Sequence, residues 1–141
     1  MSAGTTAEAG TTPAAETTPV SDRVIEDAFS ADCPARQLLN HISSRWGILI
    51  LAALRDGPTR FYVLRDRIDG ISEKMLSQHL RELTRDGLVS RTVEPSIPPK
   101  VSYGLTPIGG EVAVKLDDLL GWITARIGDV TVAQRVYDEA E

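Results

Sequence analysis

The sequence predicts a mainly α-helical fold with a small β element in its C-terminal half. Three observations support this prediction. Apolar residues recur at helical spacing through most of residues 33–86, the pattern changes to alternation in residues 88–106, and helical spacing returns from Ile108 onward. The predicted order is therefore four helices, two strands and a final long helix.

The composition is that of a globular chain. Its 141 residues are 42% hydrophobic, which suits one domain with appendages. The longest apolar run, Trp46–Leu54, is about half of the roughly 18 residues that a membrane-spanning helix needs, so we expect no membrane contact. The N-terminus lacks a basic segment followed by an apolar one, so we expect no secretion signal and a cytoplasmic location.

Charge is distributed unevenly along the chain. The net charge is −5, but residues 33–107 carry eleven basic and seven acidic groups, whereas the two flanking segments are both acidic. A basic middle segment points to a polyanionic partner for that segment. Chance variation in charge along the chain is the alternative.

Two segments precede the predicted domain. Residues 1–20 consist almost entirely of Thr, Ala, Gly, Pro and Glu, and we expect a disordered tail because little can be buried there. Residues 21–32 are expected to form an N-terminal arm or short helix, whose apolar edge could pack on the domain or on a second subunit.

The first two helices have recognisable ends. Cys33 lies at the expected cap of a helix at 33–43, and Pro34 occupies the first helical position, where its missing N–H does no harm. The helix predicted at 45–57 is apolar nearly all round, as expected of a buried central helix, and Gly57 ends it.

The next two helices are shorter and amphipathic. Thr59 is expected to cap a helix at 60–68. Ser72 is expected to cap the following helix, and Gly87 to end it.

Two strands and a long helix complete the chain. The strands at 88–94 and 100–106 are joined by a proline-rich tip, PSIPP, and Thr106 with Pro107 opens the last helix. The segment 131–139 can add a short helix. The apolar stripe of the long helix comprises Ile108, Val112, Leu116, Leu119, Leu120, Ile123 and Ile127.

The order of elements is that of a winged helix-turn-helix, in which the second helix of the pair enters the major groove of DNA. In the helix after Ser72, three leucines fall on one face, and a polar stripe roughly 60 degrees wide falls on the other. That stripe consists of Lys74, Gln78, Arg81 and Arg85. Such side chains bond to base edges, and a bidentate contact is worth about 1–3 kcal/mol of discrimination.

The candidate DNA-binding residues belong to this helix, to the start of the preceding helix and to the wing. Residues near the start of the recognition helix reach deepest, whereas basic residues further away contact phosphate and set the register. The base candidates are Lys74, Ser77, Gln78 and Arg81, the phosphate candidates are Arg85, Arg60, Arg91 and Lys100, and Ser72 is included at the helix start. Each could instead be an ordinary surface residue; the position of the stripe before a wing favours DNA.

Other side chains have simpler interpretations. Trp46, Phe61 and Tyr103 lie on apolar faces, so we expect them to pack in the core rather than stack on bases. His41 and His79 are too few and too far apart for a metal site. The sequence shows no catalytic triad, phosphate loop or conspicuous carboxylate pair, so we expect neither an enzyme nor a cofactor.

The stretch from CPARQLLNHIS through PPKVSYGLTPIG resembles the HxlR-type winged helix-turn-helix transcriptional regulators of bacteria. The resemblance lies in CP opening a helix, a Trp before an apolar helix, and the segments RF, GIS, ML, LREL, DGLV and PPKVSYGLT. It implies a dimeric DNA-binding regulator, by default a repressor, that dimerises through its terminal helices and binds an inverted repeat. The recognition helix would run from Ser72 to Arg85 and the wing from Val89 to Thr106, within a domain at 33–107 followed by a dimerisation segment at 108–141.

Cys33 is the single cysteine and a second functional candidate. A thiol at a helix N-terminus faces unpaired N–H groups and the positive end of the helix dipole, which favour the thiolate, although Asp32 opposes this effect. The resemblance implies a thiol switch here, because several members of the family sense oxidants or electrophiles through a cysteine in the CP position. Alternatively, Cys33 is a small buried hydrophobe at a cap.

The sequence is also compatible with two other functions. The first is a regulator that responds to a small molecule bound in an apolar pocket between the dimer helix and the core, with an inert Cys33. The second is a winged-helix module that binds another protein and has lost DNA binding.

Overall fold

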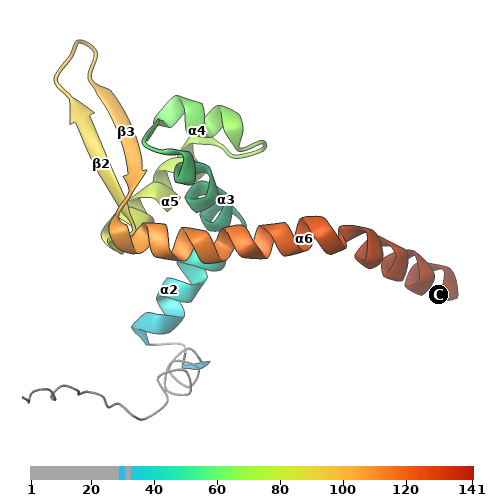
Figure 1. The fold of residues 1–141 in the computed structure, drawn as a ribbon. Helices are drawn as coiled ribbons and strands as arrows, with labels where there is room; N and C mark the ends of the chain where they lie inside the picture. Colours follow the sequence, from blue (N-terminus) through green and yellow to red (C-terminus); the bar gives the residue numbers. More distant parts are fainter. Residues whose placement is uncertain (1–28, 31–32) are drawn as a thin grey trace, which may run out of the picture. The chain divides into compact units, whose positions relative to one another are not determined.

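The computed structural model describes residues 29–30 and 33–141 (Figure 1). The predicted tail at 1–20 and the arm at 21–32, except for residues 29 and 30, lie outside this range. The chain divides into two compact units, residues 1–40 and residues 41–141. The second unit contains nearly all the described elements and is the one in which the candidate site lies.

The four predicted helices are present, with small changes at their ends. They are α2 at Pro34–Ser43, α3 at Arg45–Ala53, α4 at Phe61–Arg67 and α5 at Glu73–Arg85. A short 3-10 helix, η2 at Leu54–Asp56, continues α3 to Gly57, where φ is 122° and the helix stops. The apolar second helix is central as expected, since Ile50 and Leu51 are fully buried.

The leucine face of α5 packs into this core. Leu76, Leu80 and Leu83 are at most 1% exposed. They join a cluster that includes Leu54 of η2 and Leu64 of α4. Full burial of a leucine side chain contributes about 1.5–3 kcal/mol, so the three leucines fix which face of α5 points outward.

The wing belongs to a three-stranded antiparallel sheet with the order β1-β3-β2. Strands β2 at Val89–Glu94 and β3 at Lys100–Leu105 form the hairpin seen beside α4 and α5 in Figure 1. The third strand, β1 at Thr59–Arg60, was not predicted. It pairs with β3 through Thr59 opposite Tyr103.

The expected cap role of Thr59 is wrong. Arg60 occupies the N-cap position of α4 and makes no side-chain capping bond. Thr59 is held in extended conformation by its pairing with β3, and its Oγ1 donates to the Gly57 carbonyl at 2.8 Å. Pairing with a strand distant in sequence therefore overrides the local capping preference.

The last helix, α6, runs without interruption over Pro107–Ala140, so the segment 131–139 is helical as predicted but belongs to α6 and adds no further helix. Thr106 caps α6 by accepting from the Gly109 amide at 3.0 Å. The helix continues through Gly128 because that residue has no positive φ, unlike the glycines that end α5 and η2. No helix in the described part of the chain is long and apolar enough to cross a membrane.

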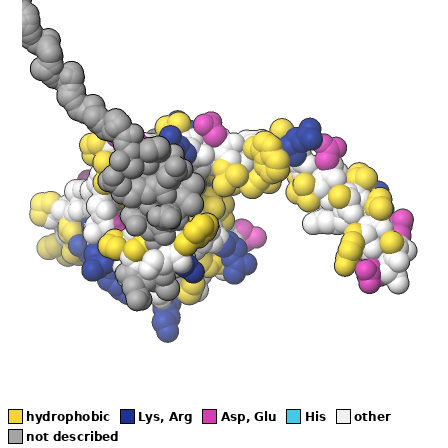
Figure 2. Space-filling view, turned by 90° about the horizontal axis from the view of Figure 1, so that it is seen from below, with side chains coloured by type: hydrophobic (Ala, Val, Ile, Leu, Met, Phe, Trp, Pro, Cys, Tyr) yellow, Lys and Arg dark blue, Asp and Glu magenta, His cyan; other side chains and the backbone are white. Residues whose placement is uncertain are grey.

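Described residues bury only the start of α6. Gly109, Ala113 and Leu116 are buried, whereas no residue after Leu116 is buried in the described chain. Several large apolar side chains of the later part are 39–66% exposed: Leu119, Trp122, Ile123, Ile127, Val130, Val132, Val136 and Tyr137. Figure 2 shows hydrophobic side chains along this extended part of the helix.

Two adjacent glycines at the start of α6 provide a test of its packing. A Cβ on Gly109 would lie 1.9 Å from the Leu88 carbonyl oxygen, whereas a Cβ on Gly110 would meet nothing within 4 Å. We expect Gly109→Ala to destabilise the fold by about 1–3 kcal/mol, because a backbone atom cannot rotate away. Gly110→Ala should be neutral or stabilising by up to about 1 kcal/mol, since alanine favours helix.

Urea denaturation of both variants measures these effects. Equal midpoints for the two alanine variants would contradict the close approach of α6 to Leu88.

Candidate nucleic-acid interface

Capping fixes both ends of α5. The Ser72 hydroxyl accepts a hydrogen bond from the Met75 amide at 3.1 Å, as expected of an N-cap. Gly87 has φ of 81°, and the Leu88 and Gly87 amides bond back to the Leu83 and Thr84 carbonyls. This arrangement is a Schellman motif, which ends the helix where the sequence predicted.

The polar stripe of α5 points outward. Lys74, Gln78, Arg81 and Arg85 are all exposed, opposite the buried leucines. The face predicted for a duplex is therefore open to a partner. Ser72 is exposed at the start of the same helix, and Ser77 is half-buried at its flank.

Two adjoining hollows bring most of the other candidates together. The first, which we call the wing groove, has a volume of about 520 Å³ and is lined by Arg60, Ser77, Arg91 and Lys100 among others. The second, about 490 Å³, is lined by Ser77, Arg81, Arg85 and Arg91. Ser77 and Arg91 line both hollows, so α5 and the wing form one continuous concave surface.

Within the described part of the chain, the cations of this surface have no carboxylate partner. Six basic residues of the candidate set form no ion pair with another described residue: Arg60, Lys74, Arg81, Arg85, Arg91 and Lys100. By contrast, Arg55, Arg67 and Arg126 each pair with an aspartate. The charge of the candidate surface is therefore available to an external anion.

Two residues of the wing groove were missed from the sequence. Glu73 and Tyr62 both line it. Arg65 of α4 donates to the Glu73 carboxylate through Nη1 and lies over the Tyr62 ring, 4.9 Å from its centroid. The hydrogen bond to Glu73 raises the pKa of Arg65. The pairing crosses the turn between α4 and α5, so helical periodicity gives no signal for it.

The three aromatic side chains pack as the sequence predicted. Trp46, Phe61 and Tyr103 pack, partly buried, against the core. His41 Nδ1 lies 2.7 Å from Asp86 Oδ2, which connects the end of α2 to the C-cap of α5. Among the described residues no group of three or more His, Cys, Asp or Glu side chains could hold a metal ion.

Cys33 lies at the N-terminus of α2, as predicted, and is half-buried. Its Sγ accepts a hydrogen bond from the Arg36 amide at 3.2 Å. The sulfur therefore occupies the position of a capping group at the start of α2.

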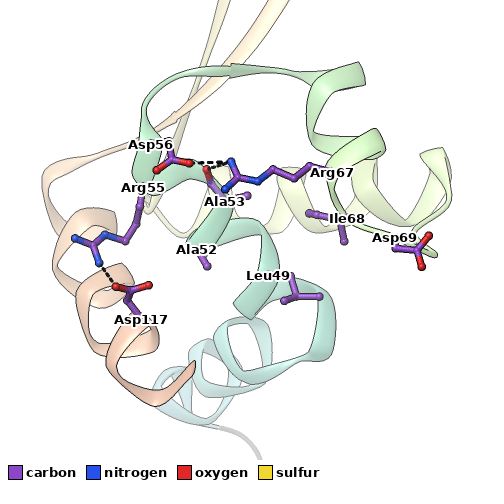
Figure 3. Close-up of a pocket in the computed structure, with 9 residues that line it drawn as sticks. All are labelled: Leu49, Ala52, Ala53, Arg55, Asp56, Arg67, Ile68, Asp69 and Asp117. Atoms are coloured by element: carbon purple, nitrogen blue, oxygen red, sulfur yellow. Dashed lines mark hydrogen bonds and ion pairs between the residues drawn. The ribbon is translucent and has the colours of Figure 1, made fainter. Parts of the chain in front are cut away.

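A separate pocket of about 660 Å³ lies where α3, η2, the end of α4 and α6 meet (Figure 3). Five of its nine lining residues are charged, and two ion pairs form its rim: Arg55 with Asp117 at 2.6 Å and Arg67 with Asp56 at 2.9 Å. The pocket lies between the last helix and the core, where the small-molecule alternative placed one. Its rim is more polar than that alternative expected.

Comparison with known proteins gives consistent matches. A family model described as HxlR-like helix-turn-helix matches residues 41–130. The uncharacterized HTH-type transcriptional regulator YtfH of Escherichia coli (strain K12) is 48% identical over 102 residues, which cover 72% of this chain and 81% of the relative.

Solved structures agree with these matches. The ytfH protein from Salmonella typhimurium matches with a TM-score of 0.71 at 48% identity, covering 76% of this chain and 95% of that one. Diamide-treated YodB from Bacillus subtilis matches with a TM-score of 0.56 at 34% identity, covering 68% and 96%.

The cap of α5 can be tested separately from any ligand. We expect Ser72→Ala to destabilise the fold by about 0.5–2 kcal/mol, because the Met75 amide loses its acceptor, whereas Ser72→Asp keeps the cap and the stability. Ser77→Ala, one turn later on the same helix, is the matched control and should be nearly neutral. Thermal or urea unfolding measures the differences, and an equal loss in Ser72→Ala and Ser72→Asp would rule out the capping bond as the cause.

Proposed function

Because the chain belongs to the HxlR-like helix-turn-helix family of DNA-binding transcriptional regulators, we propose that it is a homodimeric repressor that binds an inverted repeat. The role of the family is regulatory and not enzymatic. In this proposal two α5 helices enter successive major grooves about 34–36 Å apart.

The observation that carries the proposal is a set of six exposed cations on α5, on the wing and just before α4, none of which pairs with a carboxylate among the described residues. Five of the six cations line the two hollows and Lys74 lies on the exposed face of the same helix, and surface charge that the described chain leaves unpaired in this way suits a polyanion. Each phosphate contact releases counterions, so binding should weaken steeply with salt.

The candidate DNA-binding residues divide into those placed to contact bases and those placed to contact phosphates. Lys74, Gln78 and Arg81 project from the outer face of the first two turns of α5, which supports base contacts. Ser77 adjoins them at the flank. Phosphate contacts fall to Arg60, Arg85, Arg91 and Lys100, which are all exposed at the margins of the same surface.

A second copy of the chain is the proposed partner of α6. The apolar side chains of its later part, such as Leu119, Ile123 and Val130, are 39–43% exposed. Monomers rarely expose a contiguous apolar surface of this kind, and two copies of the helix can cover each other. The N-terminal arm is proposed to add to this dimer.

The proposed signal is oxidation or electrophile modification of Cys33. The sulfur sits at a helix N-terminus, and the matching YodB structure is of a diamide-treated protein. Each chain has one cysteine, so a disulfide must join two subunits or a small thiol. Two thiols lose two protons and two electrons when the S–S bond forms, and the N=N bond of diamide accepts both.

A small-molecule effector is the second candidate, favoured by the pocket at Arg55, Asp56 and Asp117. Its charged rim suits a polar or ionic ligand. Thermal-shift screening of the Cys33→Ser variant separates the two candidates, because a ligand of this pocket still raises the melting temperature when the thiol is gone.

The DNA proposal makes a quantitative prediction. We expect Arg81→Ala to weaken binding to the operator by about 5- to 100-fold, and Lys100→Ala to weaken binding to all sequences and lower the salt slope by about one. Arg55→Ala is the matched control, because Arg55 is an exposed arginine paired with Asp117. Fluorescence anisotropy with a fragment of the chain's own promoter, over a range of salt concentrations, measures all three.

Equal effects of Arg81→Ala and Arg55→Ala would contradict the assigned surface. If no promoter fragment is bound at low salt, and replacing Gln78 and Arg81 changes nothing on DNA, the protein-binding module is the better explanation.

The thiol proposal is tested with diamide or a quinone. We expect mass spectrometry to show modified Cys33 together with a change in operator affinity. Cys33→Ser removes every thiol from the chain and should keep its affinity under the same treatment. A Cys33→Ser variant that still responds to the oxidant would end the proposal.

A further inference from the structure

Among the described residues that line the wing groove, the first residue of α5 is the only acidic one. Glu73 lines it together with Ser77, Arg91 and Lys100, and its side chain is 59% exposed. The other polar side chains there can donate hydrogen bonds, whereas an ionised carboxylate only accepts them. A carboxylate repels phosphate, so its presence on a surface that suits DNA requires a separate explanation.

The Glu73 carboxylate is held in place by α4. Arg65 Nη1 donates to Glu73 Oε2, the Arg65 guanidinium lies over Tyr62, and it also contacts Asp66 at 3.3 Å. An arginine with partners on three sides has little freedom left, and it restricts Glu73 in turn. A further hydrogen bond to the second carboxylate oxygen therefore costs little additional side-chain entropy.

The chemistry of the major groove limits what such a group can bind. Cytosine N4 and adenine N6 are the donors there, whereas guanine and thymine present acceptors. Adenine N6 lies beside the N7 acceptor, which repels a carboxylate. Cytosine N4 has no acceptor of its own base beside it in the groove, so cytosine is the better partner.

We propose that Glu73 is a specificity-determining residue that accepts a hydrogen bond from the N4 amino group of a cytosine in each half-site. The inference rests on the proposed DNA-binding function and assigns a base preference to it. Arg65 is a positioning residue in this arrangement, since it acts through Glu73 and not on the base.

A purely structural role for Glu73 has a different signature. An acidic residue in the first turn of a helix interacts favourably with the helix dipole, and that role affects stability without setting a base preference. Base reading adds a loss of base preference to the loss of phosphate repulsion that removal of this carboxylate causes in either case. Discrimination against the wrong base pair falls, and binding to unselected DNA becomes tighter because one repulsion of phosphate disappears.

The experiment begins with selection of sites by the full wild-type chain from duplexes with a random centre of about two helical turns. Affinities for single-base-pair variants of the selected site are then measured by fluorescence anisotropy for wild type, Glu73→Ala and Glu73→Gln. We expect wild type to lose about 5- to 100-fold in affinity when one C·G pair per half-site is replaced. Glu73→Ala should lose this preference and bind the unselected pool at least as tightly as wild type.

Glu73→Gln has nearly the same shape and provides a second readout. A glutamine bonds to adenine N6 and N7, so the preferred base at the same position should change from cytosine to adenine. Glu94→Gln is the matched control, because Glu94 is an exposed carboxylate at the end of β2 that does not line the wing groove. It removes the same charge and should leave every base preference unchanged.

The outcomes separate the two proposals. If wild type selects a site and both Glu73 variants keep every base preference of that site, the assignment of Glu73 is overturned while DNA binding stands. If wild type selects no site and binds no pool, the proposed function fails and the assignment fails with it. The assignment is supported if both Glu73 variants change the base preference at one position of each half-site and Glu94→Gln changes it at none.

Discussion

The packing of the α5 leucines against α3, η2 and α4 is the contact on which the rest of the structure depends. Leu76, Leu80 and Leu83 are nearly inaccessible to solvent, and their burial determines the rotation of α5 about its own axis. A helix rotated by half a turn about its axis would bury the cations and expose the leucines. The exposure of the cationic face follows from this constraint and needs no separate interaction to maintain it.

The position of the wing depends on a second contact, which the sequence did not predict. Strand β1 has only two residues, yet it joins the start of α4 to β3 through Thr59 and Arg60. Because β3 also pairs along its whole length with β2, the wing is attached to the helical part through backbone hydrogen bonds. The groove between Ser77 and Arg91 therefore has one rigid wall of helix and one of sheet.

Features of the fold could be predicted from the sequence where the residues that determine them are close together in the chain. Ser72 and Gly87 bracket α5 through capping bonds that lie within one turn, and the leucine spacing states which face is buried, so both predictions were confirmed. Strand β1 was missed, because a two-residue strand is defined by its partner and not by its own sequence. The continuity of α6 was missed for a related reason. Gly57 and Gly87 end helices with a positive φ, whereas Gly128 has none, and the residue type alone does not distinguish these cases.

The residues of the candidate site were likewise predicted where their signal is local in the sequence. Exposed cations along a helix repeat at helical spacing and were found, although their contacts with DNA remain a prediction. Glu73 was not predicted as a site residue, because its proposed role depends on its hydrogen bond with Arg65, eight residues earlier in the preceding helix. A single acidic residue at a helix start is ordinary in sequence; only the turn between α4 and α5 brings it to the guanidinium that orients it.

The end of α5, the start of the wing and the start of α6 meet at one point. Thr106 Oγ1 donates to the Gly87 carbonyl at 2.6 Å, and the Thr106 amide donates to the Leu88 carbonyl at 3.0 Å. Gly109 then approaches Leu88 so closely that no side chain fits between them. The proposed dimer helix is thus joined to the proposed recognition helix without a flexible linker. If two α6 helices pair, their crossing angle sets the separation of the two α5 helices, and any signal that changes that packing changes the fit to an inverted repeat.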